Sequence, residues 1–414
     1  MTQQYNEHCT HCGMCIEVCP MYSEIDLIDE LCSYLDGNCE QVTSEDIFRC
    51  LTCGLCVQAC PEDLSLKKLI TTARASWVKT HGMREEHTIV DPCSGNNLFV
   101  AMSKISEHAV FPKDKDVGSV VYYPGCAAGY INTNIAAATI NILDRVGVDY
   151  TVLSGVSHCC GAVSAGSGNK GLMEEMGRKN VTEVKRRGAK TLITSCPGCY
   201  RAFVDMYPRV FGELDFEVLQ ISQYLKRLID EKRIVPQQVL EHRVFYQDPC
   251  HLTRSVGIYE EPRDVISSMP GTHLVNECHE GSKCCGFGGS VRAIFPSESV
   301  KLASLQIETA KDMGCDVIVT NCPGCMQNLV EAGMNYDDAD DADDADDADD
   351  ADDADDADDA DDDSIMVYDL TEYVSMSLGF AVVRNDIDMI DSVNQAYCNV
   401  ITRYCKPQTS MKNK

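Results

Sequence analysis

The chain has 414 residues, of which 44% are hydrophobic, so it is long enough for two to four domains with apolar cores and is not an intrinsically disordered protein. Its net charge is −30, but the Asp/Ala tract at 337–363 supplies 19 of these negative charges and leaves −11, with no basic stripe that would indicate nucleic-acid binding. The 25 cysteines favour metal ligation over disulfides, because the N-terminus lacks the features of a secretory signal and no run approaches the roughly 18 apolar residues of a membrane span.

The first 61 residues contain the pattern C-x2-C-x2-C-x3-C-P twice. Such a run gives three thiolates to one [4Fe–4S] cubane cluster and the fourth to the other cluster of a pair. Structural zinc sites instead use two separated C-x2-C pairs, which makes zinc the weaker alternative. The predicted ligand sets are Cys9, Cys12, Cys15 and Cys60 for one cluster, and Cys50, Cys53, Cys56 and Cys19 for the other.

Helices are expected between and after these two runs. The first helix should follow a Ser23 cap, with Asp26 at the capping-box position, and should stop at Gly37. A second should begin at Thr43 or Ser44, and a third should cover 63–79. The domain with these helices and both cysteine runs resembles the helical two-cluster ferredoxin modules of respiratory dehydrogenase subunits.

A larger duplication covers 118–236 and 244–379. Each copy begins with a β-rich run, alternates β and helical segments, and carries five cysteines, spaced C-x32-CC-x35-C-x2-C and C-x33-CC-x36-C-x2-C. This alternation predicts two α/β modules with parallel strands, whose sites form at the carboxyl ends of the strands. The five cysteines of each copy should therefore gather at one edge of their module. They are Cys126, Cys159, Cys160, Cys196 and Cys199, and then Cys250, Cys284, Cys285, Cys322 and Cys325.

Five ligands exceed the four of a tetrahedral zinc site or of a cubane cluster. The two five-cysteine sets resemble the paired cysteine-rich CCG domains of heterodisulfide reductase, and related domains occur in the iron–sulfur subunits of anaerobic glycerol-3-phosphate, glycolate and lactate dehydrogenases. The resemblance implies two non-cubane [4Fe–4S] clusters, each held by all five cysteines of its set, on either side of a cavity in which a disulfide is reduced. These ten cysteines would then be the catalytic centre.

Several other residues are secondary candidates. Gly166–Gly171 fits the nucleotide-binding pattern G-x-G-x-x-G, but it does not follow a predicted strand. A glycine-rich turn that lets the backbone pass close to a cluster is therefore the better interpretation. Gly286–Gly289 occupies the same place in the second copy. Three polar side chains lie next to ligand cysteines in the sequence: His158, His251 and Lys283. They could deliver protons or anchor an acidic substrate, or they could simply hydrogen-bond cluster sulfur or lie on the surface. Seven cysteines lie outside every motif: Cys32, Cys39, Cys93, Cys278, Cys315, Cys398 and Cys405. They are expected to be buried apolar groups or plain thiols, and only Cys278 is a candidate for an additional ligand. The Asp/Ala tract should be a solvated, disordered loop inserted into the second copy.

The predicted architecture is a multi-domain α+β chain. A helical ferredoxin-type domain (1–90) and a linker (91–117) precede two pseudo-symmetric α/β CCG domains (118–236 and 237–379), and a tail (380–414) follows. The leading hypothesis is a cytoplasmic oxidoreductase subunit, not itself membrane-spanning, that reduces a small disulfide of the coenzyme M–coenzyme B type with a membrane b-type cytochrome as partner. The second is a relay subunit beside a flavoprotein dehydrogenase in anaerobic metabolism, and the third is a scaffold for four zinc ions.

Overall fold

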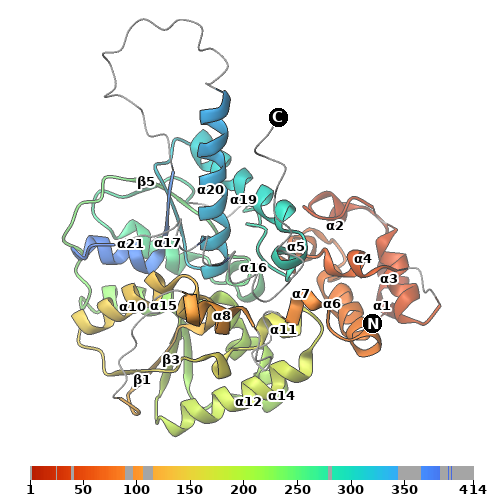
Figure 1. Ribbon diagram of the computed structural model, residues 1–414, viewed down its shortest axis with the longest axis horizontal. Coiled ribbons are helices and arrows are strands. Elements are labelled where there is room, and N and C mark those ends of the chain that lie inside the picture. The colour runs from red at the N-terminus through yellow and green to blue at the C-terminus, as the bar shows by residue number, and fades with distance from the viewer. Residues whose placement is uncertain are drawn as a thin grey trace, which may run out of the picture.

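The computed structural model describes residues 2–24, 26–38, 42–88, 97–105, 115–277, 282–343, 365–382, 390 and 393. Several predictions fall outside these residues: those for Cys39, Cys93, Cys278, Cys398 and Cys405, for most of the tail, and for 344–363 of the Asp/Ala tract. The described chain forms an N-terminal helical domain beside two stacked α/β modules, module 1 (115–236) and module 2 (237–382) (Figure 1).

The N-terminal domain consists of short helices around an apolar core. They are α1 (Thr2–His8), α2 (Met14–Glu17), α3 (Leu27–Leu35), α4 (Ser44–Phe48), α5 (Leu55–Ala59), α6 (Leu66–His81) and α7 (Glu85–Thr88). The predicted cap of α4 is confirmed: Asp46 N donates to Thr43 Oγ1 at 3.2 Å, and Thr43 N donates to Asp46 Oδ2 at 2.8 Å. The predicted Ser23 cap of α3 is wrong, because the helix begins only at Leu27, where its buried face begins.

Module 1 is a four-stranded parallel sheet flanked by helices. Its strands β1 (Val120–Tyr123), β2 (Tyr150–Val152), β3 (Thr191–Thr194) and β4 (Glu217–Gln220) lie in the order β2-β1-β3-β4. The predicted parallel strands are thus confirmed. The helices are α9 (Gly125–Tyr130), α10 (Thr133–Arg145), α11 (Ala162–Gly166), α12 (Lys170–Arg186), α13 (Pro197–Arg201), α14 (Pro208–Phe211) and α15 (Ile221–Asp230), with a 3-10 turn at Val156–His158 and a π-helical stretch at Ala202–Met206.

Module 2 repeats this topology. Its strands β5 (Arg243–Tyr246), β6 (His273–Leu274), β7 (Val317–Thr320) and β8 (Met366–Asp369) lie in the equivalent order β6-β5-β7-β8, also parallel. The helices are α16 (Thr253–Val256), α17 (Glu260–Ser267), α18 (Val291–Ile294), α19 (Pro296–Asp312), α20 (Pro323–Asp343) and α21 (Leu370–Ser377). The matching strand orders make the two modules pseudo-symmetric.

Two segments differ from the sequence-based expectation. The linker predicted at 91–117 contains a helix, α8 (Leu98–Ile105), because Leu98, Ala101 and Met102 supply an apolar face that is buried. The first seven residues of the Asp/Ala tract continue helix α20 as far as Asp343, and so they are not a loop. Alanine is the strongest helix former, and a helix that is already nucleated extends at little cost.

The two modules share one apolar core. Helix α10 of module 1 packs against α21 of module 2, and α15 of module 1 packs against α17 of module 2, so the contacts repeat across the boundary. One continuous set of buried residues includes Ile142 and Leu225 from module 1 and Val265 and Val374 from module 2. The modules are therefore packed as one unit, and the carboxyl ends of their strands are held in fixed relation.

Arg74 of α6 connects the N-terminal domain to both modules. Its side chain is fully buried, and each of its five N–H groups points to a backbone carbonyl. Three acceptors lie in the N-terminal domain, one in module 1 and one in module 2: Ile47 O at 3.0 Å, Phe48 O at 3.1 Å, Cys50 O at 2.7 Å, Gly166 O at 2.9 Å and Gly289 O at 3.0 Å.

This arrangement gives a reason for two of the glycines in the glycine-rich turns. Gly168 and Gly289 have φ of 100° and 64°, and a Cβ on either would overlap backbone of the N-terminal domain, at Arg74 and at Cys50–Leu51 respectively. Ser167 Oγ and Ser290 Oγ, one from each turn, lie 2.7 Å apart. Gly168 and Gly289 must be glycine because the N-terminal domain docks against them, and the approach of these turns to a cluster stays a prediction.

Candidate metal centres

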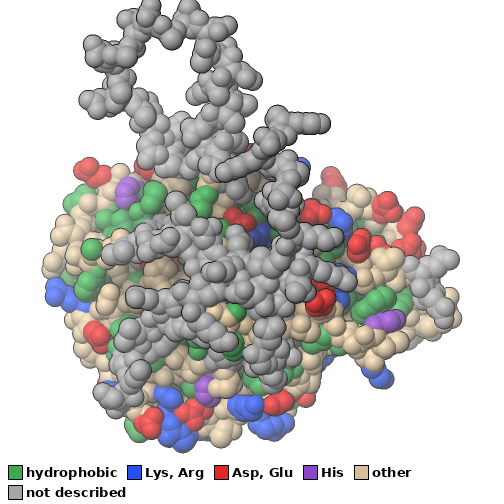
Figure 2. All heavy atoms as spheres, in the orientation of Figure 1, with side chains coloured by type: hydrophobic (Ala, Val, Ile, Leu, Met, Phe, Trp, Pro, Cys, Tyr) green, Lys and Arg blue, Asp and Glu red, His purple; other side chains and the backbone are tan. Residues whose placement is uncertain are grey.

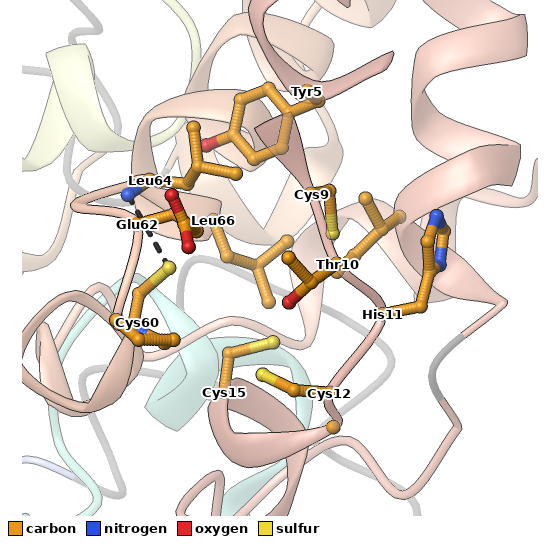
Figure 3. A pocket seen from close by; sticks show the side chains of 13 residues that line it. Tyr5, Cys9, Thr10, His11, Cys12, Cys15, Cys60, Glu62, Leu64 and Leu66 are labelled. Carbon is orange, nitrogen blue, oxygen red and sulfur yellow. Dashed lines mark hydrogen bonds between the residues drawn. The ribbon is translucent and has the colours of Figure 1, made fainter. Parts of the chain in front are cut away.

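Four of the predicted cysteines line a pocket at the outer side of the N-terminal domain, here called pocket A. Cys9, Cys12 and Cys15 come from the loop before α2 and its first turn, and Cys60 comes from the end of the second cysteine run (Figure 3). Gly13, with φ of 80°, turns the chain between Cys12 and Cys15. Leu64 N donates to Cys60 Sγ at 3.4 Å.

The second set lines pocket B, on the side of the domain nearer the modules. Cys50, Cys53 and Cys56 surround the turn at Gly54, which has φ of 82°, and Cys19 comes from the first run. Thr52 N donates to Cys50 Sγ at 3.3 Å. Each run therefore contributes three cysteines to one pocket and its fourth to the other, which is the exchange predicted from the spacing.

In each module the five predicted cysteines form one connected chain of sulfur contacts. Site 1 has the order Cys126–Cys159–Cys160–Cys199–Cys196, and site 2 has the order Cys250–Cys284–Cys285–Cys325–Cys322. The thiol contact of Cys285 with Cys325 measures 3.0 Å. The connectivity is the same in both modules, because each cysteine follows the carboxyl end of the equivalent strand.

The glycine after each cysteine pair lets the chain turn sharply. Gly161 and Gly286 have φ of 71° and 85°, and a Cβ on either would overlap backbone of the second helix along the chain, at Met173 of α12 and at Ser299 of α19. The pairs are also held through their carbonyl oxygens. Asn180 Nδ2 donates to Cys159 O at 3.0 Å, and Asn328 Nδ2 donates to Cys285 O at 2.6 Å.

Pocket B, site 2 and site 1 lie next to one another in that order. The Cys53 thiol of pocket B hydrogen-bonds the Cys284 thiol of site 2, and this contact lowers the pKa of Cys53 to about 6. The Cys322 thiol of site 2 lies close enough to Cys196 of site 1 for their charges to interact. Pocket A is farther along the same domain, so the four cysteine groups form a series from the outer side of the N-terminal domain to the boundary between the modules.

Cations that the sequence motifs did not reveal surround the junction of pocket B with site 2. Arg254 Nε donates to Cys53 O at 2.8 Å, its Nη1 donates to Ser282 O at 2.9 Å, and Lys67 Nζ donates to Ser255 Oγ at 3.2 Å. Burial opposes the charge of Arg254, yet the neighbouring thiols Cys250, Cys284 and Cys53 raise its pKa. Only the positions of these cations in space, and no local pattern, identify them.

The three side chains singled out beside the ligand cysteines have different surroundings. His251 lies at the junction, with Nε2 3.4 Å from Thr52 Oγ1, and burial together with Arg201, Lys67 and Arg254 lowers its pKa well below the usual range. His158 Nδ1 lies 3.2 Å from Asn180 Oδ1, while Lys283 is exposed. Cys32 and Cys315 are buried among apolar side chains, as predicted.

The donor sets fit iron–sulfur clusters. All of the groups consist of sulfur, the donor that soft metals and Fe–S clusters select. Burial raises the pKa of Cys50 to about 11 and of Cys56 to about 12, so these thiols stay protonated until a metal replaces the proton. In the described part of the chain, no three His, Cys, Asp or Glu side chains stand at the spacing of ligands to a single metal ion.

Comparison with known families agrees with this geometry. Residues 120–203 and 244–330 match the cysteine-rich CCG domain, and residues 8–65 match the 4Fe-4S dicluster domain. The chain thus contains a 4Fe-4S dicluster domain followed by two cysteine-rich CCG domains. The predicted resemblance to CCG-domain proteins is confirmed, as is the predicted order of these domains.

Several curated proteins match large parts of this chain. One component of the dihydromethanophenazine:CoB–CoM heterodisulfide reductase of Methanosarcina acetivorans is 36% identical over 225 residues, which are 53% of this chain and 55% of that protein. One component of the fumarate reductase (CoM/CoB) of Methanothermobacter marburgensis is 31% identical over 51% of this chain and 41% of its own. The EtfAB:quinone oxidoreductase of Syntrophomonas wolfei is 25% identical over 78% of this chain and 43% of its own. The chain spans about half the length of the curated relatives it matches.

Proposed function

We propose that this chain is the disulfide-reducing subunit of a heterodisulfide reductase-like complex, with sites 1 and 2 as its catalytic centre. The observation that carries the proposal is that both five-cysteine sets are complete, have the same connectivity and adjoin at the boundary between the modules. Cleavage of a disulfide into two thiols takes two electrons, and two one-electron centres beside one disulfide match this demand. Iron–sulfur clusters, when bound, supply one-electron redox chemistry of this kind.

The residues that would hold these clusters follow from the pockets. Pocket A (Cys9, Cys12, Cys15 and Cys60) and pocket B (Cys19, Cys50, Cys53 and Cys56) would each hold a cubane [4Fe–4S] cluster. The five cysteines of site 1 and the five of site 2 would each hold a non-cubane cluster. The Cys53–Cys284 contact and the Arg254 bonds fix pocket B against site 2, so the distance between them is set by the fold.

The substrate would be a small disulfide of the coenzyme M–coenzyme B type, and the electron donor a membrane b-type cytochrome or a flavoprotein. No helix in the described ranges is long and apolar enough to cross a bilayer. A cytoplasmic protein held at the inner face of the membrane by its partner is the arrangement we propose.

Two serine variants test the assignment. Cys160→Ser and Cys285→Ser each remove one ligand from one site, and disulfide reduction by a reduced viologen dye should fall at least a hundredfold in both. Cys32→Ser is the matched control, because Cys32 is buried in the N-terminal domain outside all four groups, and its turnover should match that of the wild type. Wild-type rates in both site variants would refute the proposal.

Iron analysis of the same preparations tests the metal. The four clusters require about 16 iron atoms per chain, four for each [4Fe–4S] unit. An iron-free, colourless chain that contains zinc would defeat every redox model and favour the zinc scaffold.

A second candidate is supported by a specific observation. The EtfAB:quinone oxidoreductase matches 335 residues and covers more of this chain than the reductase subunits do. In this alternative the chain relays electrons between a flavoprotein dehydrogenase for glycerol 3-phosphate, glycolate or lactate and a quinone, and its CCG sites perform no substrate chemistry. Copurification with a flavoprotein, together with absence of disulfide turnover in the iron-loaded chain, would favour the relay, whereas copurification with a b-type cytochrome would favour the reductase.

A further inference from the structure

Asp369 is a buried carboxyl group at the edge where the sites form. It ends strand β8, and its register partner on β7 is Thr320, two residues before the site 2 ligand Cys322. The side chain is fully buried, and its Oδ1 accepts from Thr371 N at 2.9 Å and from Thr371 Oγ1 at 2.6 Å. Its Oδ2 is buried and has no hydrogen-bond partner. Capping of helix α21 needs only Oδ1, so the second oxygen is not explained by the cap.

The internal symmetry supplies a direct comparison, because Gln220 holds the equivalent position in module 1. Gln220 ends β4 and pairs in register with Thr194, two residues before Cys196. Its Oε1 also accepts from the second residue of the following helix, Ser222 N at 2.6 Å. In addition it crosses the boundary between the modules: Asn321 Nδ2 donates to Gln220 Oε1 at 3.0 Å. An amide thus faces an amide on this half of the boundary.

The other half is built from different groups. The counterpart of Asn321 is Ser195, which immediately precedes Cys196, and Ser195 Oγ lies 2.9 Å from Tyr122 Oη and 3.4 Å from Thr139 Oγ1. In module 2 the equivalent Tyr246 Oη donates instead to Asn321 Oδ1 at 2.6 Å. One half of the boundary therefore has amides, which hold their protons, and the other has a carboxyl group and three hydroxyls, which can both donate and accept.

The surroundings of Asp369 favour its protonated form. Burial, together with the nearby Glu372 and against the hydrogen bonds from Thr371, raises the pKa of Asp369 to about 7. From the neighbouring elements, Tyr122 of β1 and Tyr246 of β5 lie within its electrostatic reach, and the cation of α17, Arg263, is already paired with Asp248 at 2.7 Å. Glu372 itself accepts from Asn134 Nδ2 at 2.5 Å and from Asp369 N at 2.9 Å.

We propose that Asp369 holds a proton at the boundary between the two sites and supplies it, beside the Ser195 and Tyr122 hydroxyls, to one of the two sulfurs released when a disulfide is reduced. This inference rests on the proposed function. In the reaction the S–S bond breaks, two electrons arrive from an external one-electron donor such as a reduced viologen, and each sulfur gains one proton. Asp369 gives one of the protons and is reprotonated from solvent, while the other proton comes from solvent. The two halves of the disulfide would then leave by different proton routes.

The variant Asp369→Asn tests the proton role and spares the cap, because asparagine caps helices as well as aspartate does. We expect disulfide turnover at pH 6 to fall ten- to a hundredfold, with the pH dependence near pH 7 abolished and the electron paramagnetic resonance spectrum unchanged. Glu372→Gln is the control: it should keep the pH dependence and move it to slightly lower pH, since a negative charge beside Asp369 is removed. Turnover of Asp369→Asn with the wild-type rate and pH profile would overturn the inference.

Infrared difference spectra between pH 6 and pH 8 give a readout that does not depend on turnover. The wild type should show the carbonyl band of a protonated carboxylic acid that disappears as the pH rises, and Asp369→Asn should lack it. Absence of this band from the wild type would overturn the inference. A wild type that shows the band but reduces no disulfide would contradict the proposed function, and with it the role of the held proton in that reaction.

Discussion

Replacement of Arg74 by methionine should detach the N-terminal domain from both modules. The substitution removes five hydrogen bonds from a charged donor to backbone carbonyls in three parts of the chain. A hydrogen bond to a charged group contributes about 1.5–3 kcal/mol. If relaxation or water satisfies three of the five carbonyls, the two that remain would still cost about 3–6 kcal/mol. Relief from burying the guanidinium charge, whose pKa burial lowers, offsets part of this.

The assay is an anaerobic guanidinium chloride titration followed by the visible absorbance of the bound clusters. Arg74→Met should lower the midpoint strongly, and Arg74→Lys, with three donors for five carbonyls, should fall between it and the wild type. Arg49→Met is the control at the same interface, since its ion pair with Glu298 spans 3.9 Å between side chains that are 36% and 45% exposed, and such pairs contribute about 1 kcal/mol or less. Equal midpoints for Arg74→Met and Arg49→Met would refute the claim that Arg74 holds the domains together.

Three further predictions follow from buried or clustered charges. Asp248→Asn leaves Arg263 buried without its carboxylate, so we expect a loss of about 3–5 kcal/mol of unfolding free energy and earlier loss of iron on heating, whereas an unchanged melting temperature would contradict this. Burial lowers the pKa of His87 to about 3, so below pH 6.5 the unfolded chain binds a proton that the folded chain does not, and the free energy of unfolding should fall by roughly 1.4 kcal/mol per pH unit. The variant His87→Phe should flatten this slope between pH 6.5 and 5.5, and an unaltered slope would show that His87 does not titrate as described. Residues 1–65 contain twelve Asp and Glu against one Arg, acidic side chains gather over the N-terminal domain on the face shown in Figure 2, and Glu62 lines pocket A. The rate at which a cationic viologen radical reduces the protein should therefore fall severalfold with rising salt and in the variant Glu62→Lys. A stopped-flow rate that does not depend on salt would exclude electrostatic steering.

The cysteine spacing was sufficient to predict which cysteines meet within each domain. This works because a parallel sheet brings its strand ends to one edge and because the short C-x2-C turns leave little conformational choice. The helix after Thr43 was predictable for a similar reason, since its capping box is local. Ser23 failed as a cap because the buried face of α3, and not the local cap signal, decides where that helix begins.

Contacts between domains were not predictable in this way. The Cys53–Cys284 contact, the five carbonyls around Arg74 and the cations at the junction join residues up to more than 200 positions apart, and no local pattern specifies how separately folded units dock. The glycine-rich turns illustrate the same point: their sequence indicated a close approach, but only the structure identifies the N-terminal domain as the approaching group. Likewise, only the matching strand orders of the two modules show that Asp369 and Gln220 hold equivalent positions, at the ends of β8 and β4.

A single-turnover experiment tests the central claim most directly. The iron-loaded chain is fully reduced under anaerobic conditions, freed of reductant, and mixed with the coenzyme M–coenzyme B heterodisulfide, and the thiols formed are counted. The account predicts two new thiols for each disulfide consumed and two electrons lost from the protein. No thiols above those in a mixture with the Cys285→Ser chain would contradict it and leave the chain as a relay.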